Sequence, residues 1–397
     1  MQIIYISRVC SEKTFKKIYD LTNGRVGQQI QKYHKLIVDG LKNNDVNITV
    51  ISKLQYYDKK IDINSFEEEE GIKYNYIKNY KNPLFKQLCF YFSTLKLILK
   101  HIKDKNTVII CDGLNIMLSL AAKKATKIKK CKNAVIVTDV PGIIMTDNSK
   151  TTFKNRCISK FNIKLINSFQ SFIFLTEQMN DMLNKYHKPY IVIEGQVDIN
   201  MANKNIIKAN DLKKIFLYAG IISRKNGVDK LVQAFSELNL NNVELHLYGD
   251  GEYEETLKKI CNSNQSIRFF GIKENTYIIE QEIKASVLVN PRPSFDEFTK
   301  YSFPSKIMEY MASGTPLLTT KLAGIPVEYF DYLYLLLDES IEGFKKEIVN
   351  LYNKTNQELN LTGLKAKEYV LKEKNNIIQA KNIISIFNKY NIDKETK

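Results

Sequence analysis

Two serines and a glutamate in the second half of the chain have the spacing of a ligand-binding helix. Ser302, Ser305 and Glu309 are three and four residues apart, so they would share one helix face. The helix would open near Pro304, a residue type suited to a first turn, and would end at the following Gly-Thr-Pro. The apolar run SVLVN precedes the segment, so we expect the helix to follow a buried strand.

The start of such a helix favours a phosphate. Its first backbone N–H groups can donate hydrogen bonds to an anion, and Ser302, Ser305 and the cation of Lys306 would lie beside them. Glu309 would lie about 6 Å farther along the axis than Ser305, at ~1.5 Å per residue. That is roughly the offset from a nucleotide's phosphate to its ribose, whose hydroxyls can donate to a carboxylate. The alternative is an ordinary capped helix with Glu309 in solvent.

Cations and glycines follow other strand-like runs. In YAGIISRKNGVDKL, Arg224 and Lys225 lie between an expected strand and an expected helix, where they could neutralise a diphosphate. A solvated basic turn is the alternative. Gly249 and Gly251 in YGDGE would let the backbone approach a ligand, or would simply make a tight turn. In FFGIK, a base could rest against the backbone of Gly271 and Ile272.

The first half of the chain offers fewer candidates. Gly27, in the loop NGRVGQQ, precedes an apolar-periodic helix and could lie close to a phosphate, or could simply lead into the helix. Asp139 follows the run AVIVT, where a carboxylate could contact a substrate or cap a structural element. Glu177 and Glu194 also end expected strands, where capping is the more common role.

These residues all follow short β-branched runs that alternate with helix-length segments. Runs such as TVIIC and AVIVT are apolar throughout, which is typical of strands buried on both faces of a parallel sheet. In such sheets, ligands bind beyond the carboxyl ends of the strands. The expected strands are Gln2–Ser7, Val46–Ser52, Thr107–Cys111, Ala134–Thr138, Phe172–Thr176, Tyr190–Glu194, Ile215–Ala219, Val243–Tyr248, Ile267–Gly271, Ser286–Asn290, Pro316–Thr319 and Leu333–Leu337.

A polar, Asn- and Lys-rich stretch at 198–214 separates two series of these units. The sequence therefore predicts domains at 1–200 and 201–375, and a C-terminal helix at 376–397 that packs back towards the first domain. The acidic run 67–70 is expected in a solvated loop or at the approach to a strand.

The order of these signatures resembles the retaining family 4 glycosyltransferases. Residues 212–345 are similar to the family's nucleotide-sugar-binding domain, through Arg-Lys-x-Gly-Val-Asp, YGDGE, FFG and SFPSKIMEYMASGTP. The start, MQIIYISRVCSEKTF, is similar to the capsule and exopolysaccharide branch of that family. The resemblance implies an α/β chain with the GT-B fold, in which two Rossmann-like, doubly wound domains face each other across a cleft.

The resemblance also implies a donor sugar carried on UDP, GDP or ADP, a glycan or lipid-linked acceptor, and retention at the anomeric carbon. It assigns the diphosphate to Arg224 and Lys225 and the ribose to Glu309. Departure of the diphosphate would be assisted by electrostatic stabilisation, with no metal and no cofactor besides the donor. The other donor-binding candidates are Gly27, Gly249, Gly251, Ile272, Ser302, Pro304, Ser305 and Lys306.

The chain departs from the family pattern at two points. Many members carry a first glutamate eight positions before the one matched by Glu309, and this sequence has Tyr301 there. Glu297 or Asp296, on the same loop, could take over its contact with the sugar, and Glu297 and Asp139 are the candidates for catalysis. The Gly-Arg that usually follows the first strand of the second domain is also absent, because Gly220 precedes an isoleucine.

The basic excess has a location. The formal net charge is +16, and residues 94–132 hold ten lysines against two aspartates. The preceding segment, 84–99, is rich in Leu, Phe, Tyr and Ile, so a basic and aromatic face could rest on an anionic membrane. A core helix with lysines on its solvated side is the alternative.

Other function classes fit less well. The sequence lacks nucleic-acid-binding signatures and contains six arginines among its basic residues, so no nucleic-acid partner is expected. No run approaches 18 apolar residues and no leader precedes the first strand, so we expect a cytoplasmic protein that can be peripheral to the inner face of the plasma membrane. A nucleotide-sugar epimerase or phosphorylase on the same fold, or a non-enzymatic basic protein that binds membranes or nucleic acid, remains the alternative to a sugar transferase.

Overall fold

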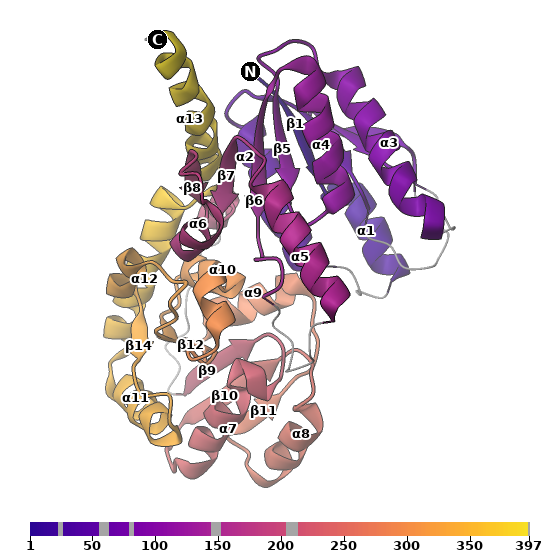
Figure 1. The fold of residues 1–397 in the computed structure, drawn as a ribbon. Helices are drawn as coiled ribbons and strands as arrows, with labels where there is room; N and C mark the ends of the chain where they lie inside the picture. Colours follow the sequence, from indigo (N-terminus) through magenta and orange to yellow (C-terminus); the bar gives the residue numbers. More distant parts are fainter. Residues whose placement is uncertain (23–26, 55–62, 79–82, 144–151, 204–212, 396–397) are drawn as a thin grey trace. The chain divides into compact units, whose positions relative to one another are not determined.

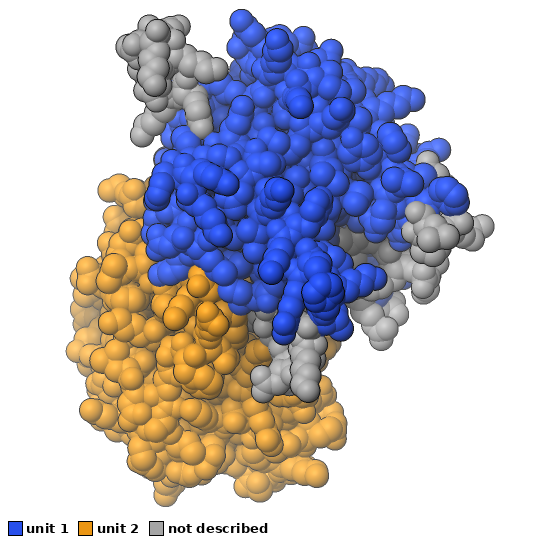
Figure 2. All heavy atoms as spheres, viewed as in Figure 1, with its two compact units in different colours: residues 1–196, 376–397 blue, residues 197–375 orange. Residues whose placement is uncertain are grey.

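The computed structural model describes residues 1–22, 27–54, 63–78, 83–143, 152–203 and 213–395, and shows two compact units (Figures 1 and 2). Unit 1 combines Met1–Gln196 with Asn376–Lys397, and unit 2 is Val197–Asn375. Each unit is built on its own sheet, with helices on both faces (Figure 1).

Unit 1 contains an eight-stranded sheet in the order β3-β4-β2-β1-β5-β6-β7-β8. All neighbouring strands are parallel except β3, which runs antiparallel to β4. The strands are β1 Gln2–Ser7, β2 Asn47–Ser52, β3 Phe66–Glu69, β4 Ile72–Tyr76, β5 Val108–Asp112, β6 Lys132–Val137, β7 Ser171–Phe174 and β8 Tyr190–Val192. The helices are α1 Glu12–Leu21, α2 Gln28–Lys42, α3 Pro83–His101, α4 Ile116–Lys129, α5 Phe153–Ile166 and α6 Glu177–Leu183.

Unit 2 contains a six-stranded parallel sheet in the order β11-β10-β9-β12-β13-β14. Its strands are β9 Lys214–Ala219, β10 Val243–Tyr248, β11 Ile267–Phe269, β12 Val287–Asn290, β13 Leu317–Thr320 and β14 Tyr334–Leu336. Its α-helices are α7 Val228–Glu237, α8 Glu254–Ser263, α9 Asn275–Lys284, α10 Ser305–Ser313, α11 Ile341–Asn353 and α12 Asn356–Glu373. Short 3-10 turns lie at η1 Ile199–Asn203, η2 Arg224–Asn226, η3 Glu297–Tyr301 and η4 Val327–Tyr332.

The expectation of two α/β units on mainly parallel sheets is confirmed. The central strands are apolar and buried along their whole length, because helices cover both of their faces: in β5 and β12 every residue is buried. The carboxyl ends of the parallel strands in each unit meet at one edge of its sheet, and this edge carries the candidate residues.

The acidic run 67–70 is not a solvated loop. Residues Phe66–Glu69 form strand β3, which pairs with β4 as a hairpin that the sequence analysis missed. The Glu69 carboxylate accepts hydrogen bonds from the backbone N–H groups of Glu12 and Lys13, at 2.9 and 3.2 Å. The hairpin therefore places negative charge at the N-terminus of α1, where the helix dipole favours it.

The C-terminal segment forms two helices that lie in different units. Helix α12 packs against α10 in unit 2, and α13, Asn376–Glu395, packs against α2 in unit 1. Ala380, Ile383 and Phe387 of α13 are buried in the core of unit 1. Of the stretch 198–214 that the sequence presents as a linker, 199–203 form η1 and 204–212 lie outside the described residues.

Candidate active site

The loops that follow the strands of unit 2 pack against one another at the carboxyl edge of its sheet. A Cβ on Gly227 would lie 2.0 Å from the carbonyl oxygen of Pro291, and a Cβ on Gly249 would lie 1.9 Å from that of Gly220. Real side-chain atoms do not approach so closely, so both contacts require glycine. The loops after β9, β10 and β12 are therefore in backbone contact, which gathers the side chains that they carry.

Three cations lie on these loops. Lys225 Nζ is 5.3 Å from the ring centroid of Phe298, and the guanidinium carbon of Arg292 is 5.9 Å from the same ring. Arg224, which is exposed, lies 5.7 Å from the ring of Tyr253. No carboxylate among the described residues forms an ion pair with any of the three cations. Their charge therefore remains available to an anionic ligand.

Arg292 was not singled out from the sequence. It directly follows the β12 loop residue Pro291, and it is one of only six arginines in the chain, which is the signal that could have identified it. Burial lowers the pKa of its guanidinium, and the nearby Tyr218 acts in the opposite direction. At such a high intrinsic pKa the group stays charged, so Arg292 joins Arg224 and Lys225 as a candidate for the diphosphate.

Helix α10 begins one residue later than expected. Pro304 is its N-cap, no side chain caps its first turn, and the helix runs from Ser305. Ser302 lies before it in extended backbone, with φ −137° and ψ 129°. The expectation that Ser302 shares a helix face with Ser305 and Glu309 is therefore wrong. The reason is that Pro304 takes the extended N-cap conformation, with ψ 110°, and not a helical one.

Lys306 is held between two carboxylates. Its Nζ is 3.2 Å from Oε1 of Glu282, a fully buried residue of α9, and 3.5 Å from Oε2 of Glu309. Burial alone would lower the pKa of Lys306, but the two glutamates outweigh it and raise the pKa overall. Lys306 therefore stays protonated, although part of its charge is already balanced before any ligand arrives. Glu282 was not anticipated, because its partner comes from another helix.

Tyr310 fixes the position of α10 against the sheet. Its hydroxyl accepts a hydrogen bond from the backbone N–H of Ala219 at 2.9 Å and donates to the carbonyl of Ala219 at 3.1 Å. Ala219 is the last residue of β9, so the first two turns of α10 are attached to the strand end that precedes Arg224 and Lys225. The phosphate-binding candidates on the two elements are thereby held in one arrangement.

Gly249 and Gly251 both have packing reasons to be glycine. Gly251 has a positive φ of 153°, and its Cβ would lie 2.4 Å from the carbonyl oxygen of Ile222. The expected contact of these glycines with a ligand stays a prediction. Ile272, the residue expected to lie against a base, is 69% exposed and therefore accessible.

The candidate for the sugar contact lies on η3. Glu297 opens this turn and is exposed, and Tyr301 ends it, next to Ser302. A Cβ on Gly324 would lie 2.3 Å from the carbonyl oxygen of Ser302, so the loop after β13 packs tightly on this segment. The proposed role of Glu297 stays a prediction.

In unit 1, Asp139 follows β6 at the carboxyl edge of the sheet. It keeps an exposed surface, but desolvation by its neighbours and the charge of Asp112 raise the pKa of its carboxyl. Asp112 ends the adjacent strand β5 and is 3% exposed. Gly27 is the N-cap of α2, and the preceding loop residues 23–26 lie outside the described residues.

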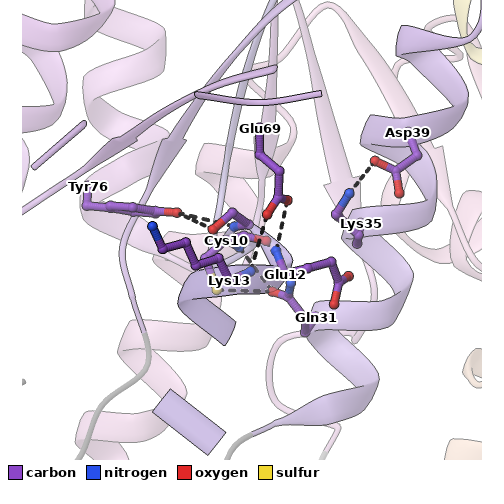
Figure 3. Close-up of polar contacts among 9 residues, drawn as sticks. Cys10, Glu12, Lys13, Gln31, Lys35, Asp39, Glu69 and Tyr76 are labelled. Atoms are coloured by element: carbon purple, nitrogen blue, oxygen red, sulfur yellow. Dashed lines mark hydrogen bonds and ion pairs between the residues drawn. The ribbon is translucent and has the colours of Figure 1, made fainter. Parts of the chain in front are cut away.

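The loop after β1 is fixed by side chains from three elements (Figure 3). The backbone N–H of Cys10 donates to Oε1 of Gln31 at 3.0 Å, and Nε2 of Gln31 donates back to the Cys10 carbonyl at 2.7 Å. The Tyr76 hydroxyl accepts from the backbone N–H of Ser11 at 3.2 Å. Burial raises the pKa of the Cys10 thiol well above its usual range, so this cluster holds the loop in place and supplies no thiolate.

No three His, Cys, Asp or Glu side chains come together as possible metal ligands in the part of the chain that the structure describes. Among the described helices, none combines the length and the apolar character needed to cross a bilayer.

The sequence and the structure were compared with those of known proteins. Residues 200–363 match the family described as glycosyl transferases group 1. Sucrose-phosphate synthase from Thermosynechococcus elongatus has a similar structure, with a TM-score of 0.71 at 14% identity over 99% of this chain and 100% of that one. No curated protein matches the chain by sequence.

Two further solved structures are similar at low identity. The lipopolysaccharide outer core galactosyltransferase WaaB gives a TM-score of 0.63 at 15% identity, over 98% of this chain and 100% of that one. Anabaena HepE, solved in complex with UDP, gives 0.63 at 12% identity over the same shares. The fold of the chain is therefore GT-B, and residues 200–363 match the family of group 1 glycosyl transferases.

Proposed function

We propose that the protein transfers a hexosyl group from a nucleotide-diphosphate sugar to a glycan acceptor. The observation that carries this proposal is that Lys225 and Arg292 lie over the same ring, Phe298, in the turn that leads to the uncapped start of α10, with Arg224 next to Lys225 in the chain. Cations and helix N–H groups at one sheet edge suit a diphosphate in the ground state. They suit it better as the sugar departs and negative charge develops on the leaving oxygen.

Glu309 is proposed to accept hydrogen bonds from the ribose of the donor. It is 8% exposed and lies in the first two turns of α10, next to Lys306. Two solved relatives of the fold point in the same direction, since one was solved with UDP and another is described as a galactosyltransferase. The nucleotide of the donor is proposed to be UDP, GDP or ADP.

Transfer is proposed to proceed with retention and without a metal, as in family 4 of the retaining enzymes and their capsule and exopolysaccharide branch. Glu297 would contact the transferred sugar, and Asp139 of unit 1 would contact the acceptor or the sugar. The raised pKa of the Asp139 carboxyl favours a group that can exchange a proton with an acceptor hydroxyl. The configuration of the product, read by NMR, tests retention directly.

The acceptor is proposed to be lipid-linked, and the protein is proposed to be cytoplasmic and to work at an anionic membrane surface. The support is the excess of lysine on the helices of unit 1, including four on α4. Nucleic acid is not a proposed partner.

The first experiment is a thermal-shift panel with UDP, GDP, ADP and their sugar conjugates. A ligand that binds only the folded state adds about 2.7 kcal/mol of stability at a hundredfold excess over its dissociation constant. We expect a shift with one base that is lost in the double variant Arg224→Ala, Lys225→Ala. The matched control is Lys259→Ala, Lys365→Ala, which removes two exposed cations elsewhere on unit 2. An equal response of both double variants, or no shift with any nucleotide, would contradict the proposal.

A further inference from the structure

Three neighbouring helices of unit 1 carry basic residues and no acidic ones. Helices α3, α4 and α5 lie side by side over one face of the sheet (Figure 1) and contact one another in that order. They contain three, four and four Lys or Arg residues, and none of their described positions is Asp or Glu. A surface whose positive charges are not offset by carboxylates attracts anions.

Large apolar side chains are exposed on the same helices. Phe85, Leu88 and Phe92 of α3 are 61%, 54% and 61% exposed, and at ~100° per residue they fall within an arc of about 60°. Helix α5 adds Phe153 and Phe161, at 83% and 49%. The opposite face of α3 is buried, through Phe90 and other residues, so the exposed stripe is not part of the core.

A cavity of about 750 Å³ is lined mainly by α4, with one residue of α3 and with Asn133 and Gln170 at the amino ends of β6 and β7. Lys123, Lys124, Lys127 and Lys130 line it together with Tyr91 of α3, and none of the described lining residues is acidic. Tyr91 is about 60° around the helix from Leu88, so the cavity adjoins the apolar stripe. It lies near the start of β6, whose first residue is Lys132, and thus at the amino edge of the sheet.

The lysines of the cavity have two different environments. The ammonium of Lys123 donates to the carbonyl of Ser168 at 2.6 Å, and burial, together with the charge of Lys188, lowers its pKa. Lys124, Lys127 and Lys130 are exposed, and none pairs with a carboxylate of the described residues. One fixed donor and three adaptable cations suit a phosphate with several oxygens.

We propose that this face, formed by α3, α4 and α5, docks on an anionic bilayer, and that the cavity receives the phosphate-bearing headgroup of one lipid. The exposed phenylalanines select a bilayer over nucleic acid or an acidic protein, because only the bilayer presents anions above an apolar layer. The headgroup site lies at the edge of the sheet opposite to Asp139, so it anchors the protein and does not hold the acceptor. The inference rests on the proposed function only for its purpose, since docking needs no nucleotide.

Vesicle flotation tests the docking surface. We expect the full chain to bind vesicles containing phosphatidylglycerol and not vesicles of phosphatidylcholine alone. Removing three cations in Lys124→Ala, Lys127→Ala, Lys130→Ala should weaken binding about a hundredfold, at roughly fivefold per lysine near the surface. The control triple Lys259→Ala, Lys284→Ala, Lys365→Ala removes the same charge from unit 2 and should change binding less than about threefold. Equal losses in the two triples, or no binding to anionic vesicles, would overturn the proposal.

Two further variants separate the stripe from the cavity. Phe85→Ser with Phe92→Ser keeps every charge and should weaken vesicle binding at high salt as well as at low salt. Leu120→Trp fills the cavity at one of its lining residues without changing charge. A short-chain phosphatidylglycerol should compete with vesicles for this variant at least tenfold less effectively than for the original protein. If the short-chain lipid competes equally well in Leu120→Trp, the cavity does not bind a headgroup. If the protein binds soluble glycerol phosphate but not vesicles, its ligand is a free anion and not a bilayer. Nucleotide thermal shifts in the same variants report the proposed transferase site separately.

Discussion

At the scale of single residues, Tyr310 connects the two halves of the candidate donor site. Replacing it with phenylalanine removes one hydroxyl and leaves the backbone N–H and carbonyl of Ala219 without that partner. We expect Tyr310→Phe to lower the free energy of unfolding of unit 2 by about 1–3 kcal/mol and to weaken nucleotide binding, because α10 is no longer fixed to β9. Denaturant unfolding and nucleotide titration measure the two effects.

The matched control is Tyr332→Phe, since the hydroxyl of Tyr332 has no hydrogen-bond partner in the described part of the chain. It should leave both quantities near their original values. If Tyr310→Phe binds nucleotide as tightly as the original protein, the position of α10 does not depend on this attachment.

Glu244 of β10 should make the stability of unit 2 sensitive to acid. Its carboxylate contacts Lys213 at 2.6 Å, Arg268 at 2.7 Å and His246 at 2.9 Å. Burial raises its pKa, but the hydrogen bonds from Lys213 and His246 and the charge of Arg268 outweigh burial and lower it. A carboxyl with a lowered folded-state pKa stabilises the fold above its unfolded pKa of about 4.3. This contribution is lost as the pH falls through the lowered value.

We therefore expect Glu244→Gln to lower the melting temperature of unit 2 at pH 7, and the difference from the original protein to vanish at low pH. Thermal unfolding monitored from pH 7 down to the acid transition measures this. Glu280→Gln removes an exposed carboxylate with no partner among the described residues and is the control. A difference that stays constant down to pH 3 would show that Glu244 acts by packing and not by charge.

The position of a candidate residue could be predicted where the sequence on either side of it marks the end of a strand. Arg224 and Lys225 follow a recognisable strand, so their place at the sheet edge could be inferred. Arg292 follows β12 just as Arg224 follows β9, so the same reading could have found it. Glu282 could not be inferred in this way, because its partner Lys306 lies on another helix that only the folded chain brings close. Ser302 was misplaced because the geometry around a proline at the helix start allows either an N-cap or a first-turn position.

At the scale of elements, substitutions of the glycines after β10 and β11 distinguish the cost of a steric clash from the cost of a positive φ. Gly249 and Gly271 both have positive φ, of 127° and 67°, but only Gly249 is crowded by the Gly220 carbonyl; nothing lies within 4 Å of a Cβ on Gly271. We expect Gly271→Ala to cost about 1 kcal/mol of stability through φ alone, and Gly249→Ala to cost several times more. Equilibrium unfolding of the two variants gives the comparison, and equal costs would mean that the β9 and β10 loops separate easily.

The same scale shows what pattern reading misses. The buried parallel strands could be predicted to within one or two residues, because β-branched runs bury both faces and have few alternatives. The β3–β4 hairpin could not, since FEEEEGIKYNY contains residue types depleted in strands and covers only the sheet's edge. Glu69 of this hairpin accepts hydrogen bonds from the first N–H groups of α1. The local sequence of the hairpin does not reveal this contact.

At the scale of the whole molecule, unit 1 is assembled from two separate parts of the sequence. The chain leaves it after Gln196 and returns at Asn376. The returning helix α13 buries Ile383 and Phe387 against the core of unit 1, beside α2. Its close approach depends on Gly40 of α2, because a Cβ there would lie 2.1 Å from the carbonyl oxygen of Asn376 and 2.9 Å from Cβ of Ala380.

The variant Gly40→Leu should therefore separate α13 from α2 and destabilise unit 1, by at least the 1–3 kcal/mol typical of an overpacked contact. Hydrogen exchange followed by mass spectrometry should show faster exchange in α13 and α2, with α7 to α12 of unit 2 unchanged, because each unit has its own core. Gln29→Leu places the same side chain at an exposed position of α2 and should leave exchange unaltered. If α13 in Gly40→Leu stays as protected as before, the two helices tolerate a wider spacing and the glycine is not what sets it. If unit 2 loosens together with unit 1, the two units do not unfold independently, and stability effects assigned above to unit 2 alone would have to be measured in a chain limited to that unit.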